Sequence, residues 1–405
     1  MTTQVRPLVF TKTLDTPNPI PPSGIARALE LMQTGYLHRY GKAKGDEQDV
    51  LELEREYAAY MGVKYCVSIN SCGCGLFMAL KCVDVQPGDP VLVNAFTLAP
   101  VPGAIAHCNA EPVLVEITDD YLIDLDDLRR KAAKSKAKVL LLSHMRGHIA
   151  DMDAVTALCK EFRLTLIEDC AHTMGASWDG RMTGTFGAAA CFSSQTLKHI
   201  NSGEGGFLVT NDEDIAAKAI LYSGSYMLYM QHGARPDAAV FERWKGVIPN
   251  FSMRMSNLTA GILRAQLPLI DERAARWNAR YQQLAKQLAA IPHISVPKRP
   301  AKEEYVASSI QFSVNNLTVE QMQRFRDICN KRGISLKWYG QRNAEGFTSA
   351  HHHWEYVRSA QHLPQSDRII QGLFDMHIPL ILTDDDIKVI AAIIQQVIEE
   401  IDDFM

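Results

Sequence analysis

The feature that most constrains this chain is the alternation of short apolar segments with helical segments over its first two thirds. The apolar segments are uninterrupted and rich in β-branched residues, which is typical of strands buried on both faces of a sheet. Helical segments such as residues 151–162 separate several of them. This alternation predicts an α/β fold with an open, mostly parallel sheet. The predicted strands are residues 65–70, 91–97, 111–117, 138–145, 164–169, 189–195 and 206–212.

The sequence changes character near residue 256. Residues 256–291 look like one long helical region with a bend at Pro268, because proline cannot continue the helical hydrogen-bond ladder. We expect an N-terminal arm and large domain over residues 1–260, and a linking helix with a small α+β domain over residues 261–405. Later strands are expected at residues 308–316 and 334–339, and later helices at residues 318–332 and 384–401.

Composition excludes several classes of partner. The chain has 405 residues, 47% of them apolar and 22% charged, which is ordinary for a globular protein. Its net charge of -4 gives no reason to expect nucleic acid or a membrane as a partner. No apolar run reaches transmembrane length, and the N-terminus lacks a signal-peptide pattern. Most of the nine cysteines lie in apolar segments, so we expect a reduced, cytoplasmic protein without disulfide bonds.

Ligands of open α/β sheets bind at the carboxyl ends of the strands, so the residues that follow each strand are candidates. Ser71-Cys72-Gly73-Cys74-Gly75 follows the first predicted strand and opens a helix. Small residues at a helix N-terminus suit a phosphate, although a tight strand-to-helix turn has the same sequence. The segment lacks the G-x-G-x-x-G of dinucleotide-binding enzymes, which argues against a dehydrogenase. Cys72 and Cys74 have no second pair to complete a metal site.

Asp169 ends the strand at residues 164–169, and His172 follows it. A carboxylate in this position needs a positive partner or a hydrogen-bond role, because burial of an unpaired charge is costly. It could cap the next helix. It could also hold the pyridine nitrogen of pyridoxal phosphate protonated, as that cofactor requires. His172 alone fits either a buried histidine or a cofactor contact.

Lys198 follows the strand at residues 189–195, and Gly203-Glu204-Gly205-Gly206 comes shortly after it. A reactive lysine needs a partly desolvated pocket, because desolvation or a nearby cation lowers the pKa of the amine. The phosphate turn, the carboxylate and the lysine occur in the order expected of a lysine-bound pyridoxal phosphate enzyme. Each signal is modest alone, and the combination is much more specific.

These motifs resemble the DegT/DnrJ/StrS family of sugar aminotransferases, a branch of the fold-type-I pyridoxal phosphate enzymes. The resemblance covers nearly the whole chain, and the Asp-to-Lys pair with G-E-G-G is its most specific part. It implies a large domain of aspartate-aminotransferase type and a small C-terminal domain. The matching segments are SHMRGHIADMDAV (143–155), IEDCAHTMGA (167–176), FSSQTLKHINSGEGG (192–206), RMSNLTAGILRAQL (254–267) and LPQSDRIIQGLFDMHIPLILTDDDIKVI (363–390).

The resemblance implies a role for each matching residue. Lys198 would form an internal aldimine with pyridoxal 5'-phosphate and then transfer protons. Asp169 would pair with the pyridinium nitrogen. Ala171 would lie against one face of the ring, and His172 would lie near the ring oxygen. Ser71, Cys72, Gly73 and Ser193 would hold the phosphate.

Three positions depart from the family pattern. The family's threonine in the phosphate turn is Gly73, and its ring-stacking aromatic residue aligns with Leu98. Either Leu98 packs on the ring or Phe96 replaces it. The asparagine that reaches the phosphate from the other subunit in relatives aligns with Ser252, and Asn250 lies two residues earlier. The resemblance also implies a homodimer with active sites built from both subunits.

The resulting hypothesis is an aminotransferase that moves an amino group from glutamate or glutamine to a keto sugar, expected in nucleotide-linked form, or to a keto cyclitol. The product would serve the biosynthesis of an amino sugar, polysaccharide or secondary metabolite. One alternative is a non-transaminating dehydratase or eliminase of the same fold. Relatives that dehydrate sugars carry histidine in place of Lys198, which argues against that version. Another alternative is a non-catalytic, cofactor-binding regulator.

Other segments carry weaker signals. Tyr36, His38 and Arg39 lie in a stretch that resembles a family loop near the substrate, although a solvated loop would have the same sequence. Trp338 and Tyr339 could face the substrate or belong to an aromatic core. Histidines 351–353 fit a polar loop better than a metal site, because adjacent histidines seldom converge on one ion. No metal is therefore expected.

Overall fold

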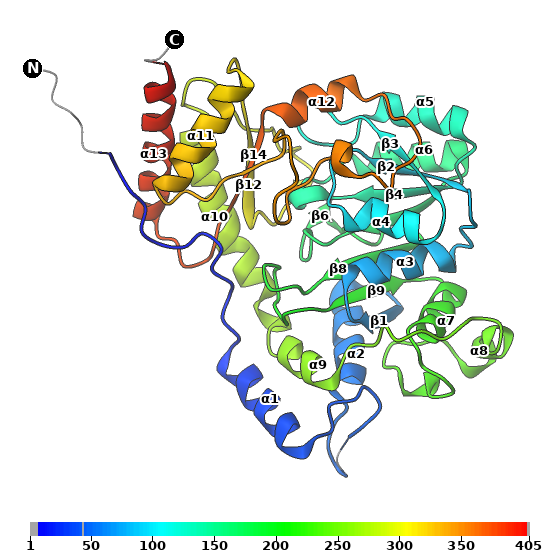
Figure 1. The fold of residues 1–405 in the computed structure, drawn as a ribbon. Helices are drawn as coiled ribbons and strands as arrows, with labels where there is room; N and C mark the ends of the chain where they lie inside the picture. The colour runs from blue at the N-terminus through cyan, green and yellow to red at the C-terminus, as the bar shows by residue number, and fades with distance from the viewer. Residues whose placement is uncertain (1–6, 43, 403–405) are drawn as a thin grey trace, which may run out of the picture.

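The computed structural model describes residues 7–42 and 44–402. A seven-stranded sheet with the order β1-β9-β8-β5-β4-β2-β3 forms its centre (Figure 1). β9 is antiparallel to both of its neighbours, and the other pairs are parallel. All seven predicted strands and the mostly parallel α/β sheet are confirmed. The strands are β1 (Tyr65–Ile69), β2 (Pro90–Asn94), β3 (Glu111–Val115), β4 (Val139–Ser143), β5 (Thr165–Asp169), β8 (Ala189–Ser193) and β9 (Gly206–Thr210).

The sheet is covered on both faces because alternate strand residues point to opposite sides. Val93 and Leu141 pack in the core of one face, whereas their neighbours Leu92 and Leu140 pack in the core of the other. The first face is covered by α3 (Cys72–Cys82), α4 (Pro100–His107), α7 (Glu213–Tyr222) and α8 (Ala238–Trp244), and the second by α2 (Asp49–Met61), α5 (Leu125–Ser135), α6 (Met152–Phe162) and α9 (Asn257–Arg264).

The C-terminal part of the chain forms a four-stranded antiparallel sheet, the small sheet, with the order β10-β12-β14-β13. The predicted strands at residues 308–316 and 334–339 and both predicted helices are confirmed. β14 was not predicted, because Asp375 and His377 interrupt its apolar pattern. The elements of this C-terminal part are β10 (Ile294–Ser295), β12 (Ser309–Val314), β13 (Lys337–Trp338), β14 (Leu373–His377), α11 (Val319–Lys331), α12 (Pro364–Gln371) and α13 (Asp384–Asp402).

The prediction of a helical region over residues 256–291 that changes direction at Pro268 is confirmed in part, since the region is helical but forms two helices. α9 ends at Arg264, a single 3-10 turn spans Leu267–Leu269, and α10 (Ile270–Leu288) begins after it. Pro268 lies within the 3-10 turn and lacks the N–H that a continuous α-helix would need. The division of the chain into residues 1–260 and 261–405 stays a prediction.

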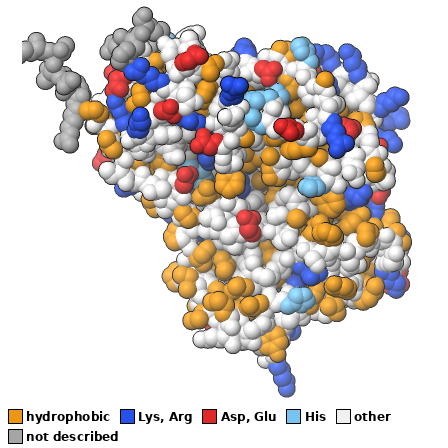
Figure 2. Space-filling model, in the orientation of Figure 1, with side chains coloured by type: hydrophobic (Ala, Val, Ile, Leu, Met, Phe, Trp, Pro, Cys, Tyr) orange, Lys and Arg blue, Asp and Glu red, His pale blue; other side chains and the backbone are white. Residues whose placement is uncertain are grey.

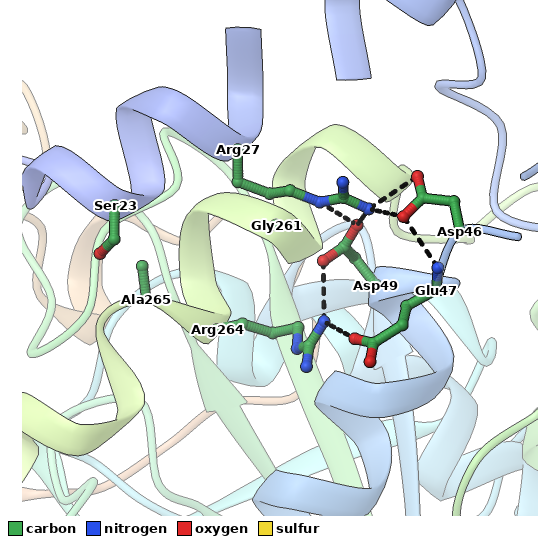
Figure 3. A pocket seen from close by; sticks show the side chains of 8 residues that line it. All are labelled: Ser23, Arg27, Asp46, Glu47, Asp49, Gly261, Arg264 and Ala265. Carbon is green, nitrogen blue, oxygen red and sulfur yellow. Dashed lines mark hydrogen bonds and ion pairs between the residues drawn. The ribbon is translucent and has the colours of Figure 1, made fainter. Parts of the chain in front are cut away.

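Ion pairs attach the N-terminal helix α1 (Pro22–Thr34) to the large sheet's helices. Asp49 is buried at the start of α2 and lies 2.8 Å from Arg27 Nη2 of α1 and 3.0 Å from Arg264 Nη1 of α9 (Figure 3). Because one carboxylate joins two guanidinium groups, these three helices are held in one arrangement.

Minor elements complete the fold. A separate three-stranded sheet has the order β11-β6-β7. Within the described ranges, no helix is both long and apolar enough to cross a membrane. The remaining elements are β6 (Ser177–Trp178), β7 (Arg181–Met182), β11 (Glu303–Glu304) and the 3-10 turns η1 (Met145–Gly147), η2 (Tyr229–Gln231), η3 (Leu267–Leu269) and η4 (His351–His353).

Candidate active site

A cavity of about 370 Å³ lies where β1, β5 and β8 end. The structure brings together there all of the predicted cofactor-site residues except Asn250 and Ser252. This position agrees with the rule that ligands of open α/β sheets bind at the carboxyl ends of the strands. The predicted residues that line the cavity are Ser71, Cys72, Gly73, Leu98, Asp169, Ala171, His172, Ser193 and Lys198.

The phosphate turn forms the N-terminus of α3. Ser71 caps the helix, and its Oγ accepts a hydrogen bond from Cys74 N at 3.1 Å. The first turn of a helix has backbone N–H groups without intrahelical partners, so it can bind an anion. Gly75 lets this turn approach the sheet closely, since a Cβ there would lie 2.5 Å from Ile69 Cδ1 and 3.0 Å from Cys191 Sγ.

Asp169 is a buried carboxylate that is oriented by uncharged donors. Its Oδ2 accepts a hydrogen bond from Ser143 Oγ at 2.6 Å, and its Oδ1 accepts one from Ala171 N at 3.2 Å. The Cys72 thiol lies 3.7 Å from the same Oδ1. No ion pair involves Asp169 among the residues that the structure describes. A buried carboxylate without a cationic partner fits a ligand that brings its own positive charge, such as a pyridinium nitrogen.

Lys198 is partly buried and lies in the same cavity. Burial is the largest cause that lowers its pKa, to about 7, and the Arg146 guanidinium lowers it further. Its Nζ lies 2.9 Å from His172 Nε2. The pKa of His172 is also well below its usual value, because of burial and the nearby Lys198. A neutral amine is therefore accessible near neutral pH, which is what a nucleophilic lysine requires.

The glycines after Lys198 hold its loop in place. Lys198 N donates to Gln195 O at 2.8 Å, and Thr196 N donates to Gly203 O at 3.0 Å, so the chain folds back on itself. Gly205 has φ 157°, and a Cβ there would lie 2.4 Å from Ser194 Oγ. The Gly-rich segment is thus required for the close return of the chain, and it places the lysine at the end of β8.

Two of the predicted site residues lie outside the cavity. Asn250 and Ser252 are exposed and do not line the cavity. Asn250 Oδ1 accepts a hydrogen bond from Tyr226 N at 2.8 Å, and Ser252 Oγ accepts one from Arg254 Nη2 at 3.5 Å. A contact between these residues and the site could only come from a second copy of the chain.

The structure also places several residues whose roles the sequence left open. Leu98 lines the cavity, whereas Phe96 is buried edge-to-face against Tyr339, with their ring centroids 5.2 Å apart. Trp338 is buried in the core of the small sheet. Arg39 is 1% exposed and pairs with Glu54 at 2.7 Å, so the interpretation of Arg39 as a substrate contact within this chain is wrong.

One group of candidate metal ligands occurs among the described residues, namely His144, Glu168 and Cys170. All three are buried, and the Glu168 oxygens already accept hydrogen bonds from the backbone N–H groups of Gly184, Phe186 and Gly187 at 2.8 to 2.9 Å. This carboxylate therefore organises the loop before β8. The histidines 351–353 form the turn η4, where His351 pairs with Asp367.

Sequence reasoning missed several residues of the site. Ser143 ends β4 and orients Asp169, and the rule that ligands lie at strand ends could have identified it. Arg146, Lys337 and His377 also line the cavity. Lys337 and His377 come from the small sheet, and nothing in their local sequence indicates that this sheet faces Lys198.

Solved structures share this architecture. A 3-amino-5-hydroxybenzoic acid synthase has a TM-score of 0.82 at 24% identity, covering 97% of this chain and 99% of that one. The aminotransferase TlmJ from Streptoalloteichus hindustanus has a TM-score of 0.80 at 20% identity, covering 95% and 99%. The fold is that of the pyridoxal phosphate-dependent aminotransferases of fold type I.

The chain belongs to the DegT/DnrJ/EryC1/StrS aminotransferase family, whose model matches residues 25–395. It is similar to the GDP-perosamine synthase of Caulobacter vibrioides, with 32% identity over 278 residues, 67% of this chain and 70% of that protein. It is also similar to the 3-amino-5-hydroxybenzoate synthase of Amycolatopsis mediterranei, with 31% identity over 318 residues, 77% of this chain and 76% of that protein. The chain is thus an enzyme of the aminotransferase class.

Proposed function

We propose that this enzyme transfers an amino group from glutamate or glutamine to a keto sugar or keto cyclitol, with pyridoxal phosphate held by Lys198. One observation supports the proposal above the others. A lysine with its pKa lowered to about 7 and a buried carboxylate without a cationic partner line the same cavity. The first suits a covalent bond to an aldehyde, and the second suits a protonated ring nitrogen.

The residues present fit the cofactor. The N-terminus of α3 would hold the phosphate with Ser193, and Asp169 would hold the ring nitrogen. Ala171 and Leu98 would supply apolar contacts to the ring. When bound, the cofactor supplies an electron sink for carbanion chemistry. The Lys198 amine would remove the proton from the donor carbon that bears the amino group and deliver it to the carbon that keeps this group. His172 Nε2, 2.9 Å from Lys198 Nζ, orients that amine.

The lowered pKa of Lys198 leads to a pH-dependent attachment of the cofactor. The amine is neutral above a pH of about 7 and protonated below it, and only the neutral form attacks an aldehyde. We expect the rate at which cofactor-free protein takes up pyridoxal phosphate to rise with a midpoint near that pH. Stopped-flow absorbance measures this rate. Because Arg146 lowers this pKa, Arg146→Met should move the midpoint upward. A midpoint that lies near the pKa of a free lysine would contradict the expectation.

Gly73 leaves space for the hydroxyl that the family pattern has in the phosphate turn. A Cβ at this position would meet Pro100 Cβ at 3.6 Å, which is an ordinary contact. We expect Gly73→Thr to lower the dissociation constant of pyridoxal phosphate about 3- to 10-fold, because one hydrogen bond is added. Equilibrium titration measures the constant. Gly73→Val is the matched control, since it has the same branching without the hydroxyl. Equal affinity of both variants would exclude the hydrogen bond as the cause.

Relatives support an amino-sugar or cyclitol acceptor. Besides GDP-perosamine synthase, they include a dTDP-3-amino-3,4,6-trideoxy-alpha-D-glucose transaminase of Micromonospora megalomicea. A putative L-glutamine:3-amino-2,3-dideoxy-scyllo-inosose aminotransferase of Micromonospora echinospora also matches. The test is a panel of nucleotide-linked keto sugars, free keto sugars and keto cyclitols, with product mass as the readout. Amination of none of them would reject this acceptor class.

A regulatory role is the second candidate. The chain is 30% identical over 295 residues to a "pleiotropic regulatory protein" of Geobacillus stearothermophilus. A non-catalytic regulator would bind the cofactor without converting it in the presence of an amino donor. The lowered pKa of Lys198 favours catalysis, because a lysine that transfers protons needs an amine that is neutral near neutral pH. The lysine also argues against the histidine-based dehydratase.

We also propose a cytoplasmic homodimer in which Asn250 and Ser252 reach the partner's site. Ile25, Leu29 and Met32 form one face of α1 and are each more than half exposed. Apolar side chains gather over α1 and α8 (Figure 2). Exposed apolar faces of this kind mark subunit contacts. Sedimentation velocity should give the mass of a dimer, and Leu29→Lys should weaken it. A wild-type monomer at micromolar concentration would contradict the proposal.

A further inference from the structure

Three basic side chains in the cavity are not among the predicted cofactor contacts. Arg146 follows β4, Lys337 lies in β13, and His377 ends β14. We call these three residues the basic cluster. All line the cavity that contains Lys198, although they come from other elements than the predicted cofactor contacts. The α3 phosphate turn is therefore one anion site, and the basic cluster is a second group of donors in the same cavity.

The basic cluster has more positive charge than its own carboxylate neutralises. Arg146 Nη2 lies 2.9 Å from Asp375 Oδ2, and Lys337 Nζ lies 3.8 Å from the same oxygen. One carboxylate thus faces two permanent cations. The other charged groups that line the cavity are Lys198, Asp169 and Glu204, and Asp169 is already directed by Ser143. An anionic ligand group would complete this balance.

Buried donors in the cluster lack partners. Arg146 Nε and His377 Nδ1 have no hydrogen-bond partner among the described residues, although both atoms are buried. Burial, Arg146 and Lys337 lower the pKa of His377 to about 4, so this ring is neutral at neutral pH. A neutral imidazole can still donate one hydrogen bond. Unsatisfied buried donors are uncommon, and they indicate a group that the chain itself does not supply.

The backbone at Arg146 has an uncommon conformation. Arg146 has φ 56°, a left-handed conformation that non-glycine residues seldom adopt. The next residue, Gly147, has φ 81°, and a Cβ there would lie 2.9 Å from Val306 O. Tyr339 Oη accepts a hydrogen bond from Arg146 Nη2 at 3.3 Å. Strain of this kind collects at functional sites, where the surrounding contacts hold it.

We propose that Arg146, Lys337 and His377 bind a carboxylate or phosphate group of a substrate in the cavity of Lys198. This inference deepens the proposed function and depends on it for the identity of the substrates. The anion is either a carboxylate of the amino donor or an acidic group of the acceptor. The guanidinium and the ammonium supply charge-assisted hydrogen bonds, and His377 adds one uncharged donor.

The test measures binding of an inert dicarboxylate, succinate, by isothermal titration calorimetry to the cofactor-loaded enzyme. Lys337→Gln is the main variant, because it leaves Asp375 paired with Arg146 and so leaves the fold intact. We expect it to raise the succinate dissociation constant about tenfold. Arg146→Lys keeps the charge but loses the planar guanidinium with its several N–H donors, so it should also weaken binding. Lys337→Arg should bind as the wild type does. Lys160→Gln, at an exposed lysine of α6 outside the cavity, is the charge-matched control.

A second arm separates the two sources of the anion. The donor half-reaction is followed by rapid mixing with glutamate. If Lys337→Gln raises the glutamate concentration needed for half-maximal rate and keeps the limiting rate, the cluster binds the donor carboxylate. If it leaves the glutamate step unchanged while succinate binding weakens, the cluster binds the acceptor's acidic group. Either result supports the subsite.

Other results overturn the inference. The first is that the wild type does not bind succinate. The second is that the wild type, Lys337→Gln and Arg146→Lys bind succinate equally. The third is that these variants lose pyridoxal phosphate affinity as much as succinate affinity, which would assign the cluster to the cofactor. Failure of the proposed function has a different signature. In that case glutamate would not convert the cofactor, yet succinate binding would still depend on Lys337.

Discussion

Lys198→Ala is expected to abolish transamination, with a loss of kcat of at least about 10⁴-fold. The variant removes both the nucleophile that attaches the cofactor and the base that moves the proton. His172 Nε2, 2.9 Å from Lys198 Nζ, is a poor substitute for the amine, because its ring has a pKa far below the usual value. Steady-state assay with glutamate and a keto acceptor measures the loss.

The loss should be chemical and not structural. Lys198 is partly buried and its pKa is lowered from 10.5 to about 7, so protonating it destabilises the folded state increasingly as the pH falls from 10.5 to about 7 and fully below that. The alanine variant should therefore unfold at the same temperature as the wild type or a higher one. Lys160→Ala, on the exposed surface of α6, is the control and should keep full activity. Retention of more than a few per cent of activity by Lys198→Ala would remove the lysine from its assigned role.

Asp169→Asn should lower kcat by about 10²–10³-fold, as expected for the loss of one preorganised electrostatic contact. The substitution keeps the size of the side chain and an oxygen that can accept from Ser143. It removes the negative charge that would keep the ring nitrogen protonated. The cavity shape should remain, so the change acts on the chemistry more than on the fold.

Ser143→Ala is the matched comparison for Asp169→Asn. It removes the 2.6 Å hydrogen bond that orients the carboxylate and keeps the charge, so we expect a loss of only about 3- to 10-fold. Steady-state rates and cofactor dissociation constants should be measured for both variants. If Asp169→Asn stays within twofold of the wild type, the carboxylate does not control the ring nitrogen.

The large sheet could be predicted because its strands are buried on both faces and therefore read as continuous apolar runs. β14 could not, because Asp375 and His377 are polar residues whose burial depends on Arg146 and on the cavity. The helix at residues 256–291 was predicted as one unit because its apolar spacing continues past Pro268, and the break is a local effect of proline.

Some residues of the site could likewise be predicted from the sequence, and others could not. Ser71 and Lys198 follow strands of one mostly parallel sheet and Asp169 ends another of its strands, so topology alone brings them together. The basic cluster depends on how the small sheet packs against the large one, which no local pattern encodes. Asn250 and Ser252 were predicted by resemblance, and one chain leaves them outside the cavity.

The most direct test of the central claim is the state of the cofactor after exposure to an amino donor. Enzyme loaded with pyridoxal phosphate is incubated with glutamate or glutamine, denatured, and the released cofactor is separated by chromatography. We predict recovery of pyridoxamine phosphate together with the 2-keto acid of the donor, and none from Lys198→Ala. Recovery of unchanged pyridoxal phosphate with both donors would contradict transamination and favour a regulator or a non-transaminating enzyme.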